Sequence, residues 1–134
     1  MKFLLKSLKP KYSGIEHVKS QDNVVVIIQY RLGIFGFLSA YDTVAKKSIG
    51  GNYGLSDAAL AINFVHQNVA NLGADPDKIV LNGESAGAGM IMALMLDDDT
   101  ASRVSGAFVQ SGGTAFNFFT SGVRVLILSK VYSS

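Results

Sequence analysis

The sequence predicts an α/β fold, with a parallel sheet as its core and helices on both faces. Three features of the sequence support this class: the apolar runs, the helical stretches between them, and the length and composition of the chain. Short apolar runs recur at 24–28, 79–81 and 107–109, and stretches with helical periodicity separate them. Strands that alternate with helices form parallel sheets, because right-handed crossovers carry each helix back across the sheet. The chain has 134 residues, of which 49% are hydrophobic, and this is enough for one domain.

The five β-branched residues at 24–28 are the clearest strand signal. They lack the alternation of a half-exposed strand, so we expect a central parallel strand that is buried on both faces. The stretch 29–38 is apolar and interrupted by glycines, and the polar stretch 39–53 is expected to be a loop. Residues 1–23 carry little periodicity and are expected to be an N-terminal tail of uncertain structure.

An amphipathic helix is expected after this loop. Ser56 is a candidate N-cap with Asp57 just inside the helix, and apolar side chains then repeat at helical spacing until about Gly73. The Asp-Pro-Asp sequence at 75–77 predicts a turn, which leads into the strand at 79–81.

A second helix is expected at 90–96, where every residue is apolar, as in helices that are buried on all sides. An acidic loop then leads to the third strand at 107–109. Residues 114–134 do not continue the pattern, and their structure is left uncertain. We therefore expect the α/β core to span residues 24–113.

Composition and charge exclude several classes of protein. The net charge is only +2, and the basic residues form no dense patch of the kind that nucleic acid requires. There is no cysteine, and the two histidines lie far apart without a carboxylate motif, so no metal site is expected. No apolar run approaches the roughly 18 residues of a membrane span. Lys6 interrupts the apolar start of the chain, so no signal peptide is visible and the compartment stays open.

The sequence Gly-Glu-Ser-Ala-Gly-Ala-Gly at 83–89 lies between a predicted strand and a predicted helix. A serine with glycines two positions away on both sides, in this context, predicts the nucleophile elbow of hydrolytic enzymes. Gly83 and Gly87 keep side chains out of the sharp turn, so Ser85 can stand out of it as the candidate catalytic nucleophile. Because Ser85 also opens a helix, the N–H of Ala86 is the natural first donor of an oxyanion hole.

The same glycines also resemble the phosphate-binding turn of short-chain dehydrogenases. Two features of the sequence disagree with that interpretation. Such a turn should follow the first strand of its domain, whereas here a strand and a long helix come earlier. Those enzymes also need a Tyr-x-x-x-Lys pair, and none of the five tyrosines has a lysine four residues later. No dinucleotide or other cofactor is therefore expected.

From about residue 24 to residue 113, the chain resembles the type B carboxylesterases, the group of α/β-hydrolases that includes the cholinesterases and many lipases. Five separated blocks in the family's order carry the resemblance: 30–33 with 36–38, 51–57, 65–69 with 72–76, 83–87, and 110–112. The resemblance implies a partial α/β-hydrolase fold, a small-molecule carboxylic ester as substrate, and acyl transfer through Ser85.

Other parts of the family's catalytic apparatus are not found in the sequence. Nothing in residues 1–23 resembles the family's glycine-rich oxyanion loop, and its acid and histidine lie much farther downstream of the serine. His17 lies in an unpatterned region, and His66 lies on the side of its helix away from the apolar stripe, so neither is a good candidate for the base. We expect the remainder of the hydrolase domain to be missing, and the isolated chain to hydrolyse short aryl esters very weakly or not at all.

Further residues of the matching blocks have two interpretations. Glu84 lies near the catalytic site in relatives, where it can stabilise an imidazolium or a cationic substrate, but a carboxylate is also favourable at any helix N-terminus. Arg31 and Asp57 are expected to form a structural ion pair beneath the site. Ser111 is interpreted as a turn residue in preference to a second nucleophile.

A catalytically inert chain is the alternative to a serine esterase. Such a chain would be a truncated product or an interaction protein of the neuroligin type. The retained Ser85 argues against a lineage that abandoned catalysis, whereas the missing base, acid and oxyanion loop argue for the inert alternative.

Overall fold

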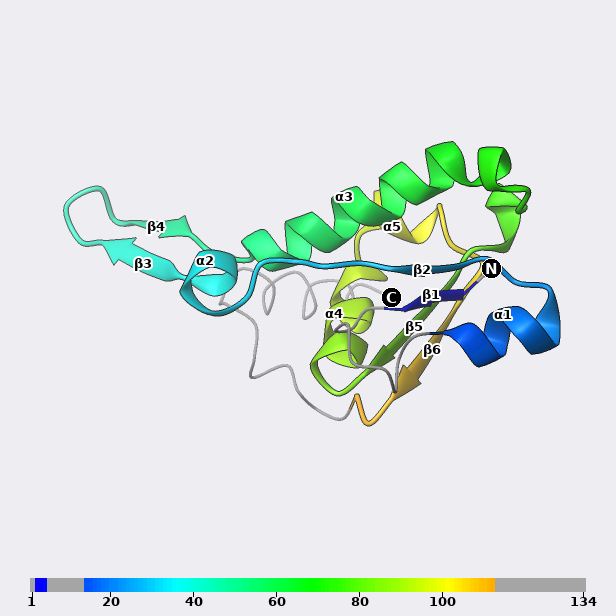
Figure 1. The fold of residues 1–134 in the computed structure, drawn as a ribbon. Coiled ribbons are helices and arrows are strands. Elements are labelled where there is room, and N and C mark those ends of the chain that lie inside the picture. Colours follow the sequence, from blue (N-terminus) through cyan, green and yellow to red (C-terminus); the bar gives the residue numbers. More distant parts are fainter. Residues whose placement is uncertain (1, 5–13, 113–134) are drawn as a thin grey trace, which may run out of the picture.

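The computed structural model describes residues 2–4 and 14–112, which form a four-stranded parallel sheet and a separate antiparallel hairpin (Figure 1). The order of the sheet is β2-β1-β5-β6. Its strands are β1 (Lys2–Leu4), β2 (Val25–Ile27), β5 (Val80–Glu84) and β6 (Gly106–Gln110). The predicted strands at 24–28, 79–81 and 107–109 are thereby confirmed as elements of one parallel sheet.

The connections between the strands run in two directions. The chain passes from β1 through α1 (Ile15–Gln21) to β2 on one side, and then from β2 through α3 (Tyr53–Asn68) to β5 on the other side. It continues in the second direction through α4 (Ala86–Leu94) to β6. Right-handed crossovers in opposite directions place α1 on one face of the sheet, and α3 and α4 on the other. The predicted α/β class is confirmed.

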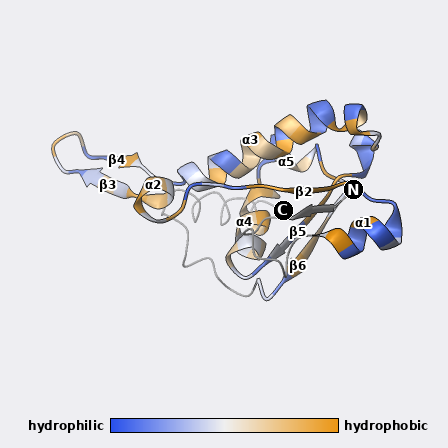
Figure 2. Cartoon of the chain, viewed as in Figure 1, coloured by the Kyte–Doolittle hydropathy of each residue, from blue (hydrophilic) through white to orange (hydrophobic). Residues whose placement is uncertain are grey.

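The core lies between the sheet and the pair α3 and α4, which contact each other. Ile62 of α3, Leu81 of β5 and Ile91 of α4 are completely buried there. Hydrophobic and hydrophilic segments alternate along α3, as expected for an amphipathic helix (Figure 2). Seven of the nine residues of α4 are buried, which agrees with the prediction of a helix that is apolar nearly all round.

Residues 1–23, expected from the sequence to be an N-terminal tail of uncertain structure, contribute β1 and α1. The strand β1 lies between β2 and β5, so it is an interior strand of the sheet. This placement makes β2 an edge strand in the part of the chain that the structure describes, and its residues are half-buried. The expectation that 24–28 is a central strand buried on both faces is therefore wrong for these residues, because β2 has a strand partner on one side only.

The stretch 39–53, predicted to be a loop, instead begins with a β-hairpin that projects from the body of the chain (Figure 1). It consists of β3 (Ser39–Asp42) and β4 (Lys47–Gly50) and follows the short helix α2 (Gly33–Phe37). The side chain of Asp42 closes the turn by accepting N–H groups from Val44 and Ala45, at 2.9 Å each. Such an Asx turn stabilises a hairpin whose strands carry no apolar pattern, and this explains why the sequence did not reveal it.

The helix α3 begins three residues earlier than Ser56, its predicted N-cap. The observed N-cap is Asn52, whose φ of 59° is in the left-handed region that asparagine tolerates. Ser56 lies one turn inside, and its backbone N–H donates to the carbonyl of Asn52 at 3.0 Å. After α3 a 3-10 turn, η2 (Val69–Leu72), ends at Gly73, where the sequence predicts the end of the helix.

The expected ion pair between Arg31 and Asp57 is confirmed. The guanidinium donates from Nη2 to Oδ1 at 2.7 Å and from Nε to Oδ2 at 2.8 Å, and the Arg31 backbone N–H donates to Oδ2 at 3.0 Å. These bonds tie the segment after β2 to the first half of α3. The hydrogen bonds from Arg31 hold the pKa of Asp57 below its ordinary value.

Because the pKa of Asp57 is lower in the folded chain than in the unfolded one, the pair stabilises the fold above the unfolded pKa of 3.8 and stops doing so as the pH falls through the folded value. We expect Asp57→Asn to lower the Tm by a few degrees at pH 7, a modest loss because the pair is partly exposed. The difference from the parent chain should shrink below about pH 4. Thermal melts at pH 7 and pH 3 test this, with Asp22→Asn on the exposed end of α1 as the control. An equal difference at both pH values would contradict the assignment.

Candidate active site

Ser85 lies between the last residue of β5 and the first residue of α4. Its backbone has φ 56° and ψ −118°, a conformation that residues with a side chain rarely adopt. A serine at a helix N-cap usually has extended backbone and binds the helix N–H groups with its hydroxyl. Ser85 makes no such capping bond, and it is exposed. The strained turn thus keeps the hydroxyl from capping the first N–H groups of α4.

The turn depends on a close approach between strand and helix at Gly83. A Cβ at this position would lie 2.6 Å from the carbonyl carbon of Gly87, 2.7 Å from its oxygen and 2.8 Å from Cδ1 of Ile91. Two of these atoms belong to the backbone and cannot rotate away. A side chain at Gly83 would therefore collide with the backbone of Gly87, as expected from the sequence.

The N-terminus of α4 is suited to an anion. The N–H groups of its first turn, beginning with Ala86, have no acceptors within the helix, and the positive end of the helix dipole lies there. No acidic residue lies in the first turn to neutralise this field. A negative charge that develops on a group bound to Ser85 would thus meet N–H donors directly.

The elbow also lies at the carboxyl end of β5, beside the point where the direction of the strand connections reverses. Ligands of open α/β sheets bind outside the carboxyl ends of the strands at such a point. The elbow is fixed to the neighbouring strand, because the N–H of Ser85 donates to the carbonyl of Gln110 at 2.9 Å. This bond joins two of the matching blocks that lie far apart in the sequence.

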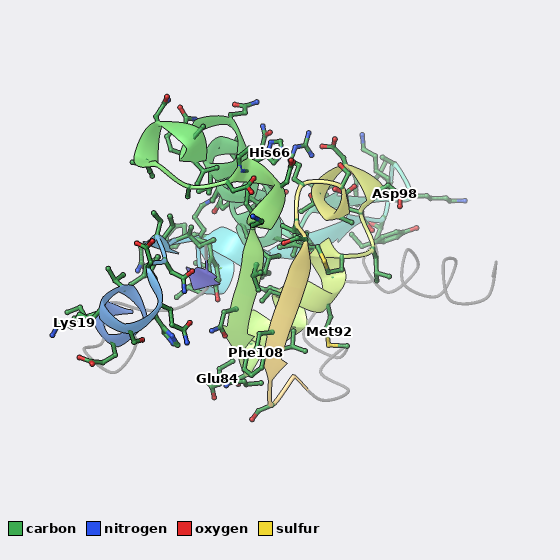
Figure 3. All side chains as sticks on the ribbon, turned by 90° about the vertical axis from the view of Figure 1, so that its right-hand side faces the viewer. Lys19, His66, Glu84, Met92, Asp98 and Phe108 are labelled. Atoms are coloured by element: carbon green, nitrogen blue, oxygen red, sulfur yellow. The ribbon has the colours of Figure 1, made fainter. Side chains whose placement is uncertain are left out.

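The remaining candidate residues are not all brought to the elbow. Glu84 lies next to Ser85 at the end of β5, whereas His66, on α3, lies at the opposite end of the view (Figure 3). His17 lies on α1, on the other face of the sheet from α4. Ser111 has a φ of 52° in the turn that follows β6, in agreement with its interpretation as a turn residue. Among residues 2–4 and 14–112, no cluster of three potential metal ligands is found.

An apolar cavity of about 550 Å³ lies between β2 and α3, away from the elbow. Its walls include Val26, Leu60 and Phe64, and none of residues 83–87 lines it. The described helices include none with the length and hydrophobicity to cross a membrane.

Two interactions of the elbow were not predicted from the sequence. The Gln110 carbonyl accepts the N–H of Ser85, and Gly112 packs against Ala88 of α4. Both residues belong to the block at 110–112, which carries part of the family resemblance and whose contacts cannot be predicted from the local sequence.

Comparisons with known proteins agree with this geometry. A model of the "Carboxylesterase family" matches residues 2–129. Juvenile hormone esterase of Tribolium castaneum is 37% identical over 101 residues, which are 75% of this chain and 16% of that protein. Neuroligin-2 of Mus musculus is 40% identical over 89 residues, which are 66% of this chain and 10% of that protein.

Among solved structures, the carboxylesterase EST55 of Geobacillus stearothermophilus superposes with a TM-score of 0.75 at 32% identity. The match covers 85% of this chain and 27% of EST55. The chain spans less than a fifth of the length of the two curated relatives. The matched structure is that of a carboxylesterase. The match of the family model begins at residue 2, so it includes β1, which precedes the region of resemblance predicted from the sequence. The chain belongs to the carboxylesterase family.

Proposed function

We propose that this chain is the nucleophile-bearing part of a serine carboxylic-ester hydrolase whose substrate is a small-molecule carboxylic ester. The backbone of Ser85 is the observation that carries the proposal. A serine with a positive φ and no capping bond, between a parallel strand and a helix, has no evident value for stability, and it presents an exposed hydroxyl beside N–H groups that have no acceptor within the helix. Membership of the carboxylesterase family supports the same chemistry.

The reaction proceeds by two acyl transfers. Oγ of Ser85 attacks the ester carbonyl and its proton passes to a general base, while the N–H of Ala86 donates to the oxyanion. Collapse of the tetrahedral intermediate releases the alcohol, which takes up the proton, and leaves an acyl-serine. Water then hydrolyses the acyl-serine and releases the acid. The carboxylate of Glu84 stabilises the cationic form of the base or a cationic substrate.

Neither histidine is proposed as the general base, because His66 lies at the opposite end of the view from Glu84 (Figure 3) and His17 lies on the opposite face of the sheet. We propose that the base, the acid and the rest of the oxyanion hole come from other parts of the hydrolase domain. This chain corresponds to 16% of the Tribolium relative, which is consistent with such a division.

Hydrolysis of p-nitrophenyl acetate tests the proposal. We expect weak turnover above the buffer rate, because the proposed base lies outside this chain, and complete loss of that turnover in Ser85→Ala. Ser111→Ala is the matched control, because Ser111 is also exposed and also has a positive φ, and it should retain the parent rate. Turnover that survives Ser85→Ala would refute the role of Ser85. A folded parent chain without any turnover would support the inert alternative.

A further inference from the structure

We propose that Gly112 is a positioning residue for the elbow: the absence of a side chain there lets the first turn of α4 settle against the end of β6, beside Ser85. This inference rests on the proposed function, since it concerns how the oxyanion donors next to the nucleophile are placed. It assigns a role to a residue that lies outside the Gly-x-Ser-x-Gly sequence.

The strand β6 holds the elbow by its backbone. Glu84 pairs with Gln110 at the end of the parallel ladder, and the next N–H along the chain, that of Ser85, donates to the Gln110 carbonyl at 2.9 Å. Directly after this bond the chain turns away, because Ser111 has a φ of 52°. The turn brings Gly112, which is buried, onto α4.

At Gly112 there is no room for a side chain. A Cβ would lie 2.9 Å from Cβ of Ala88, closer than real Cβ atoms approach one another, and 3.5 Å from Sδ of Met92. Ala88 is completely buried, so it cannot move outward without moving the helix. A side chain at position 112 therefore requires a shift, which we expect to move the first turn of α4 away from β6.

That first turn contains the N–H groups that face an anion at position 85. Ala88 is its third residue, after Ala86 and Gly87. Displacing Ala88 shifts the same three N–H groups relative to Ser85, whose own N–H remains bound to β6. Electrostatic stabilisation depends on donors that are already in place, so it should weaken when this turn moves.

The chain contains no cysteine, and this makes a direct test possible. Ser85→Cys introduces a single thiol, and the pH dependence of its alkylation by iodoacetamide reports how strongly the elbow stabilises an anion, without any ester chemistry. We expect a thiol pKa below about 7.5, compared with about 8.5 for a free cysteine. Adding Gly112→Ala should raise that pKa toward the free value and slow alkylation at pH 7 by up to about tenfold.

Two further variants separate positioning from general damage. Ala88→Gly removes the atom nearest to the new Cβ, so it should restore the low pKa when combined with S85C and Gly112→Ala. Gly106→Ala, in the strand β6 that precedes Gly112, places a Cβ with nothing within 4 Å and should leave the pKa of the S85C thiol unchanged. Circular dichroism checks that each variant is folded.

A low pKa in S85C that Gly112→Ala does not alter, or that Ala88→Gly does not restore, overturns the inference and leaves the proposed function intact. An S85C thiol with the pKa of free cysteine would count against both, because the elbow then stabilises no anion.

Discussion

Gly83→Ala should destabilise the fold and remove the reactivity of Ser85. The new Cβ would meet the backbone carbonyl of Gly87 at 2.6 Å to its carbon and 2.7 Å to its oxygen, so the strand β5 and the helix α4 must move apart. Forcing extra atoms into a packed interior costs about 1–3 kcal/mol, and here the obstacle is backbone, which favours the upper part of that range. A misplacement of about 1 Å at a reacting group costs on the order of a hundredfold in rate.

Gly106→Ala is the matched control for this change. Gly106 lies in the neighbouring strand β6, and a Cβ there meets nothing within 4 Å. Thermal or urea unfolding should show a clear loss of stability for Gly83→Ala and almost none for Gly106→Ala. Equal stabilities of the two variants would show that the close approach at the elbow is absent in solution.

The expected effect of Gly83→Ala depends on how the local sequence encodes the turn. The Gly-x-Ser-x-Gly spacing predicts the elbow because the sharp turn leaves no room for side chains two residues before and two residues after Ser85. The strands at 79–81 and 107–109 and the apolar helix around Met90 are predicted for the same reason: their apolar residues match what each element buries. The pair Arg31 and Asp57 could be anticipated only as part of the family resemblance.

Elements with weak local signals were not predicted. The residues of β1, Lys2–Leu4, are too few to show a period, and only their pairing with Val26 and Leu81 defines them as a strand. The hairpin of β3 and β4 is closed by the side chain of Asp42, with no apolar alternation. The β-branched run at 24–28 predicts a strand correctly, but its position at the edge of the sheet depends on which strands lie beside it.

The candidate site likewise combines residues that the local sequence predicts with contacts that it does not predict. Ser85, Ala86, Gly83 and Gly87 are local in sequence and could be chosen without a structure. The contacts of Gln110 and Gly112 with the elbow depend on the pairing of β5 with β6, which no local pattern encodes. A general base has to come from a distant part of a chain or domain, and neither histidine of this sequence lies where a base is required.

The most direct test of the account is the reaction of the folded chain with a fluorophosphonate probe, followed by mass spectrometry of the peptides. In this reaction Oγ of a serine forms a bond to phosphorus and fluoride leaves, so the rate of the reaction reports how strongly the hydroxyl is activated. Unlike ester turnover, the adduct needs a single reaction and no hydrolysis of an intermediate. The Ser85→Ala and Ser111→Ala variants are treated in parallel.

We predict one adduct per chain, on Ser85, that forms far more slowly than in an intact carboxylesterase, because the proposed base lies outside this chain. The adduct should be abolished by Ser85→Ala and fully retained in Ser111→Ala. An adduct on another residue, or a folded chain that stays unlabelled even after long exposure to the probe, would contradict the claim that Ser85 is the nucleophile that this elbow presents.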